Sequence, residues 1–490
     1  QQPNFITWNK GFGNKFGIEW DSIQEKIQKF GESELIDEEW EQVTWGACQN
    51  DSYLKSRAFS VIELLNVIRE RFQHNLEDEL ELAMAFASIT SVDDDIETKQ
   101  AVQKVGNKTI YSGIESKIQQ LKDEGISESE IKKIFDTPIK MTLFSWAGDI
   151  DTTLSPIDSI KYYKWYLRSS FMSMDPHNGA IKAWVGGPNY EYFKYDQVKM
   201  GKRQVGSTFK PFVYTVAMDN GWSPCYEAPN LPIVFEDFDN WSPKNSDGKQ
   251  GGMMTLRNGL ANSVNLITAF MMKQVGPQAV VNVAKKMGIT SDIPAYPSIC
   301  LGTADVSLYE MVGAYSTYAN KGVWTEPVYI SRIEDKNGNV LYEKIPRKVD
   351  ALSEQTAYLM LYMLRGVVDK GTGLRLRGPR YRFTNPIAGK TGTTQENSDG
   401  WFIGITPDLV SGVWTGAEDR SVHFRSTNLG EGANTALPIW ALYMKKVYAD
   451  ATLKISKGDF TPPAGGLDVE IDCDKFKKQS SGATNPSLDF

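Results

Sequence analysis

Two hairpin patterns, far apart in the sequence, constrain the fold more than any other feature. The first pairs residues 171–176 with 180–185 around the turn dipeptide Asn178-Gly179, and the second pairs residues 401–405 with 409–414. Helical patterns cover residues 212–218, 255–272, 278–287, 308–320, 353–368 and 436–448, and a further strand pattern covers 387–394. Because strands satisfy their backbone groups by pairing, we expect both ends to meet in one antiparallel sheet flanked by helices, an α+β fold.

The sequence divides into three regions of different composition. Residues 1–137 are rich in charged and polar residues and carry no chemical motif, so we interpret them as a mostly helical accessory or linker region. Residues 138–460 hold the motifs described below and form the predicted catalytic domain. Residues 461–490 are rich in Pro, Gly, Ser and Lys, which predicts a loose tail. Helical patterns in the first region cover residues 57–89, 114–121 and 127–135.

The composition argues against several classes of function. The formal net charge of −8 disfavours a nucleic-acid partner. The 4 cysteines form no Cys-x-x-Cys pair and the 3 histidines have no metal-ligand spacing, which disfavours a metal cluster and leaves disulfides open. No apolar run approaches the roughly 20 residues that span a bilayer. The chain starts at Gln1, so we expect a processed form or an excerpt, with membrane association only through a segment absent from it.

Ser207 and Lys210 form the first candidate catalytic pair. They lie three residues apart where an apolar helix is predicted to begin, so their side chains face the same space. A serine hydroxyl becomes an effective nucleophile when a neighbouring base takes its proton, and burial lowers the pKa of a lysine towards that role. The spacing alone is weak, because Ser52 and Ser129 begin two further Ser-x-x-Lys patterns in charged surroundings.

Two more motifs follow in the chain, and the three together are far more specific than the first one alone. Ser263-Val264-Asn265 comes near the start of an apolar helix pattern, and Lys390-Thr391-Gly392-Thr393-Thr394 lies on a predicted strand. In this order the three motifs are the signature of penicillin-binding proteins and active-site serine β-lactamases. The flanking segments 203–212 and 399–404 resemble class A penicillin-binding proteins, and the resemblance covers roughly residues 138–450, closest to the Bacteroidetes type.

The resemblance implies the penicillin-binding transpeptidase fold and a serine acyl-enzyme mechanism. Ser207 would attack the carbonyl between the two terminal D-alanines of a peptidoglycan stem peptide, and Lys210 would accept its proton. The oxyanion would sit between the backbone N–H groups of Ser207 and Thr393. D-alanine would leave with a proton delivered through Ser263, and an amine of a second stem peptide would then attack the acyl-enzyme.

The other motif residues are expected to hold the substrate. Lys390 would supply positive charge for the proton network and the substrate carboxylate, and Asn265 would bind the peptide amide. The hydroxyls of Thr391 and Thr393 would bind the same carboxylate. The resemblance thus implies the catalytic residues Ser207, Lys210, Ser263, Asn265 and Lys390, and the substrate-binding residues Thr391, Gly392, Thr393 and Thr394.

Class A proteins also carry a glycosyltransferase domain, which this sequence does not match. Its Glu-Asp-x-x-Phe-x-x-His-type motif does not occur in residues 1–137, so we predict no polymerase activity. We expect an extracytoplasmic D,D-transpeptidase that needs no metal or organic cofactor. Its expected partners are peptidoglycan stem peptides, β-lactam antibiotics and the cell-wall synthesis machinery.

Three alternative functions stay open on the sequence. A D,D-carboxypeptidase would use the same residues with water as the acceptor. A serine β-lactamase would need a group that activates water, and Glu310 lies in the right interval but on a predicted helix and without an Asn four residues later. A non-catalytic cell-wall scaffold would require a malformed site although all motif residues are present.

Overall fold

The computed structural model describes residues 121–164, 166–420 and 422–482. The chain divides into two compact units, and the described part of the first consists of residues 121–160 and 332–343. The helix predicted over 57–89, and all but the last residue of the one predicted over 114–121, lie outside the described residues. The domain boundaries expected after residues 137 and 460 stay predictions.

The described part of the first unit contains a helix, two hairpins and the first residues of α9 (Pro156–Lys164). Helix α8 (Glu128–Asp136) begins at Ser127, whose hydroxyl accepts the N–H of Glu130 while the Glu130 carboxylate accepts the N–H of Ser127, a complete capping box. The hairpins pair β1 (Ile139–Leu143) with β2 (Ile150–Leu154), and β10 (Arg332–Glu334) with β11 (Val340–Glu343).

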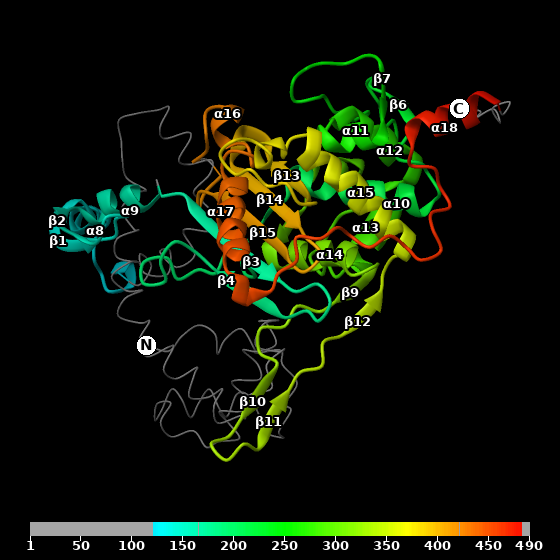
Figure 1. Ribbon diagram of the computed structural model, residues 1–490. Coiled ribbons are helices and arrows are strands. Elements are labelled where there is room, and N and C mark those ends of the chain that lie inside the picture. The colour runs from blue at the N-terminus through cyan, green and yellow to red at the C-terminus, as the bar shows by residue number, and fades with distance from the viewer. Residues whose placement is uncertain (1–120, 165, 421, 483–490) are drawn as a thin grey trace, which may run out of the picture. The chain divides into compact units, whose positions relative to one another are not determined.

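A five-stranded antiparallel sheet forms the centre of the second unit (Figure 1). Its strand order is β13-β14-β15-β3-β4, so the predicted meeting of the two distant hairpins is confirmed. Phe171 of the first hairpin lies opposite Val413 of the second. The strands are β3 (Arg168–Met174), β4 (Ile181–Val185), β13 (Ala388–Thr393), β14 (Asp399–Ile405) and β15 (Val410–Gly416). This order leaves β13, which carries the third motif, at an edge of the sheet.

Helices cover both faces of this sheet, and glycines let them approach closely. A Cβ at Gly412 would lie 2.5 Å from a side chain of α14 (Leu308–Ala319). A Cβ at Gly404 would lie 2.3 Å from Trp440 of α17 (Ala436–Ala449), on the opposite face. The sheet is therefore buried between two helical layers, which explains why β14 and β15 are buried along their whole length.

The larger helical layer carries the first two motifs. Helix α10 (Lys210–Asp219) follows the predicted nucleophile and is buried along nearly its whole length. The single helix predicted over 255–272 is wrong, because α11 (Leu256–Ala261) ends before α12 (Asn265–Val275) begins. Ser263 lies in the break with a φ of 57°, a left-handed conformation that no helix can continue through. The remaining long helices are α13 (Pro277–Lys286) and α15 (Glu354–Lys370).

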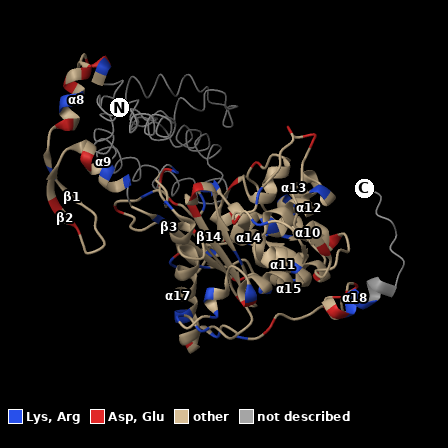
Figure 2. Cartoon of the chain, turned by 90° about the horizontal axis from the view of Figure 1, so that it is seen from above, with Lys and Arg blue, Asp and Glu red and all other residues tan. Residues whose placement is uncertain are grey.

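The other described elements are short. The two-stranded pairs are β5 (Lys202–Gln204) with β8 (Asp305–Ser307), β6 (Glu227–Pro229) with β7 (Met253–Thr255), and β9 (Val323–Thr325) with β12 (Lys348–Asp350). The short helices include α9 (Pro156–Lys164), α16 (Thr427–Gly430) and α18 (Cys473–Gly482). Figure 2 shows basic and acidic residues interspersed along the described elements. Within the described residues, no helix is both long and apolar enough to cross a membrane.

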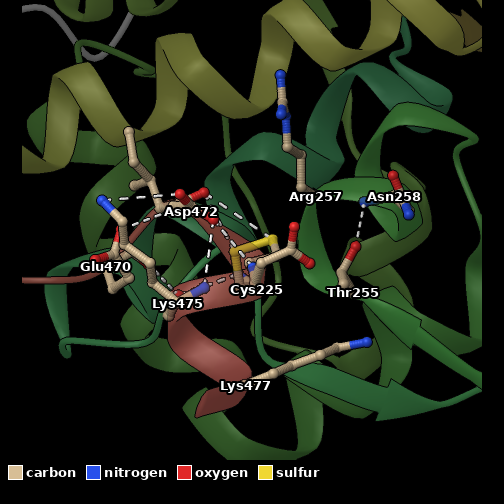
Figure 3. The surroundings of a disulfide bond; sticks show 12 residues. Cys225, Thr255, Arg257, Asn258, Glu470, Asp472, Lys475 and Lys477 are labelled. Atoms are coloured by element: carbon tan, nitrogen blue, oxygen red, sulfur yellow. Dashed lines mark hydrogen bonds and ion pairs between the residues drawn. A yellow bond between two sulfur atoms is a disulfide. The ribbon is translucent and has the colours of Figure 1, made fainter. Parts of the chain in front are cut away.

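Residues 461–482 differ from the predicted loose tail. Cys473 at the start of α18 forms a disulfide with Cys225 (Figure 3). The hydroxyl of Tyr362 on α15 also donates to the carbonyl of Ile471 at 3.0 Å. The composition misled the prediction because the anchoring partner lies 248 residues earlier in the chain.

Candidate active site

A short 3-10 helix, η3 (Gly206–Phe209), places Ser207 beside the edge strand β13. Gly206 has a φ of 52°, and a Cβ there would lie 2.6 Å from the carbonyl oxygen of Thr393. The N–H of Gly206 donates to the carbonyl of Gly302 at 3.0 Å. Only glycine fits between these two backbones, so the half-buried Ser207 is held at a fixed place next to β13.

Lys210 is fully buried one helical turn after Ser207. Its Nζ donates to the carbonyl of Ser263 and to Oδ1 of Asn265, the latter at 2.6 Å. Burial lowers the pKa of Lys210 to about 7, because the charged ammonium loses its hydration there. A lysine with this pKa is about half neutral at pH 7, and the neutral amine can accept a proton.

The break between α11 and α12 brings Ser263 between two lysines. Its carbonyl accepts from Lys210, and its hydroxyl accepts from Nζ of Lys390 at 2.9 Å. Lys390 is also fully buried and donates to the carbonyl of Thr391 at 2.9 Å. Burial, and then the nearby charge of Lys210, hold the pKa of Lys390 well below its ordinary value. The unexpected helix break is thus what joins the three motifs into one hydrogen-bonded group.

The free edge of β13 presents a backbone N–H towards Ser207. In an antiparallel pair, the backbone groups of successive residues point alternately to the partner strand and away from it. The N–H of Thr394 donates to the carbonyl of Asp399 just at the start of β14, so Thr393 turns its N–H and carbonyl the other way. The close approach of that carbonyl to Gly206 agrees with this direction. The Thr393 N–H therefore faces η3, where the sequence predicted an oxyanion donor.

The side chains of the third motif have different surroundings. Thr391 Oγ1 lies 2.6 Å from Oγ1 of Thr372, and Thr393 Oγ1 accepts the N–H of Gly432 at 3.1 Å. Gly392 packs tightly, since a Cβ there would lie 2.8 Å from a methyl carbon of the 3-10 helix. Thr394 stands apart from the group around Ser263, because its buried hydroxyl contacts Asp399 instead.

The sequence gave no role to a buried ion pair at the end of β13. Asp399 is fully buried, and its Oδ1 accepts from Nε of Arg203 at 2.7 Å and from the indole N–H of Trp414 at 2.9 Å. A carboxylate needs such partners to be stable away from water. The pair ties the segment before the nucleophile to the strand end that carries the Thr393 N–H. An aspartate directly before the apolar run of β14 was the signal that could have revealed it.

These groups can together carry out nucleophilic acyl transfer. Ser207 is a candidate nucleophile, Lys210 a candidate base, and the backbone N–H groups of Ser207 and Thr393 candidate donors to an oxyanion. Among the described residues, no group of three or more His, Cys, Asp or Glu side chains is arranged to hold a metal ion.

Comparisons with known proteins cover the region that carries the three motifs. Residues 169–417 match the model of the penicillin-binding protein transpeptidase domain, and residues 102–167 match that of the penicillin-binding protein middle domain. The chain is 36% identical over 311 residues to penicillin-binding protein 1A of Aquifex aeolicus, covering 62% of this chain and 41% of that protein. It is 34% identical over 314 residues to penicillin-binding protein 2D of Bacillus subtilis, covering 62% and 44%. The chain thus spans about two fifths of the length of these relatives.

Solved structures show the same similarity. The crystal structure of penicillin-binding protein 1A from Haemophilus influenzae aligns with a TM-score of 0.55 and 27% identity, over 61% of this chain and 49% of that one. The penicillin-binding protein PonA1 from Mycobacterium tuberculosis aligns with a TM-score of 0.52 and 26% identity, over 61% and 80%.

Proposed function

Because this chain belongs to the penicillin-binding protein transpeptidase family, we propose that it is a D,D-transpeptidase that cross-links peptidoglycan stem peptides and is acylated by β-lactams. The observation that carries the proposal is the fully buried Lys210, whose pKa of about 7 suits a base one turn from Ser207. The relatives are named as penicillin-binding proteins, which supports acylation by β-lactams. The contacts of Lys210, Ser263 and Lys390 support the roles proposed for these residues.

Acylation begins when Oγ of Ser207 attacks the carbonyl carbon between the two terminal D-alanines. Neutral Lys210 takes the hydroxyl proton, and the carbonyl oxygen becomes an oxyanion. The N–H groups of Ser207 and Thr393 donate to that oxygen, and each donor in such a hole is worth about 3 kcal/mol of the barrier. The C–N bond then breaks, which leaves an ester on Ser207.

The Ser263–Lys390 pair supports the departure of D-alanine. The leaving amine needs a proton. Lys210 donates to the backbone carbonyl of Ser263, while the hydroxyl of Ser263 accepts from Nζ of Lys390. We propose that Lys210 returns its proton to the amine, with the Ser263 hydroxyl, held by Lys390, as the relay once the substrate is bound. The amine of an acceptor stem peptide then attacks the ester, Lys210 accepts its proton, and Ser207 is released.

The substrate carboxylate is expected to bind beside β13. Thr393 already accepts the N–H of Gly432, so its own hydroxyl proton is free to be donated to an anion. Lys390 lies on the same strand, and an approaching carboxylate would favour its charged form, which burial otherwise disfavours. A substrate that ends in a free carboxylate, such as a stem peptide or a penicillin, fits this combination of charge and hydroxyl donors.

A β-lactamase is disfavoured by the surroundings of Glu310. Its Oε1 accepts from Thr290 and Ser291, and its Oε2 accepts from Ser291 and Ser307, so both oxygens are used to hold the start of α14. Burial raises its pKa, but these hydrogen bonds outweigh burial and hold the pKa below its ordinary value. The carboxylate is thus a structural cap rather than a base for water.

The disulfide bears on the compartment in which the protein works. Disulfides persist in oxidising compartments such as the periplasm and are rare in the cytosol. The Cys225–Cys473 bond therefore supports the proposed extracytoplasmic location, where the stem peptides and the cell-wall synthesis machinery are found.

The function is tested with a synthetic stem pentapeptide as donor and a second stem peptide with a free side-chain amine as acceptor. Mass spectrometry is expected to detect a cross-linked dimer that has lost one D-alanine, and Ser207→Ala should abolish it. Ser129→Ala is the matched control, because Ser129 begins another Ser-x-x-Lys pattern and is exposed in the first turn of α8. Release of D-alanine without a dimer would identify a carboxypeptidase, and no reaction of either kind would contradict the proposal.

A further inference from the structure

The start of helix α12 is capped from a distant loop rather than by its own sequence. Its N-cap residue is Val264, which has no side-chain oxygen to offer to the first free N–H groups. Oδ1 of Asn245 accepts the N–H of Leu266 at 3.0 Å instead. The loop of residues 230–251 therefore supplies a cap at the turn that carries Ser263 and Asn265.

Asn245 is itself firmly anchored within this loop. Its Nδ2 donates to Oδ1 of Asn230 at 2.8 Å and to the carbonyl of Lys249 at 2.6 Å. With Oδ1 on the helix, the side chain makes three hydrogen bonds and has one defined amide orientation. The neighbouring carbonyl, that of Lys244, is thereby held against the site, where it accepts Nδ2 of Asn265 at 2.8 Å.

This contact decides which end of the Asn265 amide faces the base. Because Nδ2 is bound to the Lys244 carbonyl, Oδ1 must point to Nζ of Lys210. A neutral lysine amine has two N–H donors and one lone pair. The Ser263 carbonyl and Asn265 Oδ1 take both donors, so the lone pair is left for a third direction. Ser207, one turn earlier, is the residue that this lone pair is expected to deprotonate.

We propose that Asn245 is a positioning residue for the acylation step, which acts through the Lys244 carbonyl and Asn265 to aim the lone pair of Lys210. This inference rests on the proposed function of the same site. Without Asn245, the Asn265 amide is free to rotate and to present its NH₂ group to Lys210. The NH₂ group of Asn265 and Nζ of Lys210, both donors, then face each other. The charged form of Lys210 loses an acceptor, and its neutral form is no longer directed at Ser207.

The loss of one hydrogen bond to a charged group, worth about 1.5 kcal/mol, corresponds to a pKa lower by about one unit. Asn245→Ala should therefore change acylation by penicillin G in two ways. The plateau of the second-order rate constant should fall about tenfold or more, and the acid limb of its pH profile should move about one unit lower. A merely structural defect would reduce the amount of active protein without moving the acid limb.

The experiment measures this rate constant between pH 5.5 and 9 by intact mass, on the whole chain of 490 residues. Asn230→Ala removes one anchor of Asn245 but keeps its cap, so a smaller change of the same kind is expected if Asn245→Ala folds poorly. Asn282→Ala is the matched control, because its exposed side chain on α13 accepts a hydrogen bond from Gln278 of the same helix. It should leave the profile unchanged.

The outcomes separate this inference from the proposed function. If the unmodified protein is not acylated, the proposed function fails and takes the inference with it. If the unmodified protein is acylated but Asn245→Ala and Asn230→Ala keep its rates and its acid limb, the inference alone is wrong. A lower plateau with an unmoved acid limb would also overturn it, because it would reduce Asn245 to a structural residue.

Discussion

Removing the Cys225–Cys473 disulfide is expected to lower the thermal midpoint of the second unit by about 10 °C. The bond closes a loop of 248 residues in the unfolded chain. The loop-closure relation assigns about 5.5 kcal/mol to a loop of this length at 25 °C. A domain of this size loses about 2 °C of thermal midpoint for each kcal/mol.

The native contacts around the bond support an effect of this size. Residues 467, 469 and 471 pack against the main core, and Tyr362 donates to the backbone beside the disulfide. The tail thus joins α15 to the segment that follows α10. The disulfide also restricts the unfolded chain and so lowers its conformational entropy. Once the bond is removed, that restriction is lost and only these contacts hold the tail in the folded state.

The assay is thermal unfolding of three samples: the unmodified protein, the same protein with a reductant, and the double variant Cys225→Ser/Cys473→Ser. The second and third samples should both unfold about 10 °C lower, and the reductant should not change the double variant further. At temperatures well below the thermal midpoint, acylation by penicillin should remain, because neither cysteine takes part in the hydrogen bonds among Lys210, Ser263 and Lys390. If the thermal midpoint falls by less than about 2 °C in both the reduced sample and the double variant, the disulfide does not stabilise the second unit as the loop-closure relation predicts.

Four further predictions concern the site. Acylation should rise about tenfold per pH unit below pH 7 and level off above it, as neutral Lys210 accumulates; a rate independent of pH from 5.5 to 8 would contradict this. The pKa values of Lys210 and Lys390 are lower in the folded state, so the unfolded state binds more protons and stability, measured by urea unfolding, should increase from pH 7 to 9. Gly206→Ala should abolish acylation through the clash with the Thr393 carbonyl, and a rate within threefold of the unmodified protein would refute the fit. Asp399→Asn should destabilise the protein by about 3 kcal/mol by chemical denaturation, because it removes the charge partner of the largely buried Arg203; a change below 1 kcal/mol would contradict that role.

The sequence predicted the sheet and most helices because local signals there agree with the packing. Asn178-Gly179 turns β3 into β4, and the glycines of β14 and β15 let helices cover both faces. The helix break at Ser263 escaped prediction because helical spacing continues across it. The contacts of Ser263 with two buried lysines, and the N–H of Val264 donating to the Gly259 carbonyl, stabilise its left-handed conformation.

The residues that the sequence missed act through distant contacts. Cys473 forms a disulfide with Cys225, Asp399 forms an ion pair with Arg203, and Asn245 caps a helix twenty-one residues later. No short motif encodes such pairs, because each partner is an ordinary polar residue until the fold brings them together. The motif residues, in contrast, carry their chemistry in their spacing, so the Ser207–Lys210 pair could be proposed before the fold was known.

The central claim is that Ser207 is the nucleophile of a penicillin-acylated transpeptidase site. The measurement that tests it most directly is intact mass after incubation with excess penicillin G, for the unmodified chain and for Ser207→Ala. If Ser207 is the nucleophile, we expect one stable adduct of the mass of penicillin on the unmodified chain and none on the folded Ser207→Ala variant. An adduct that persists in the variant, or no adduct on the folded unmodified chain, would contradict it.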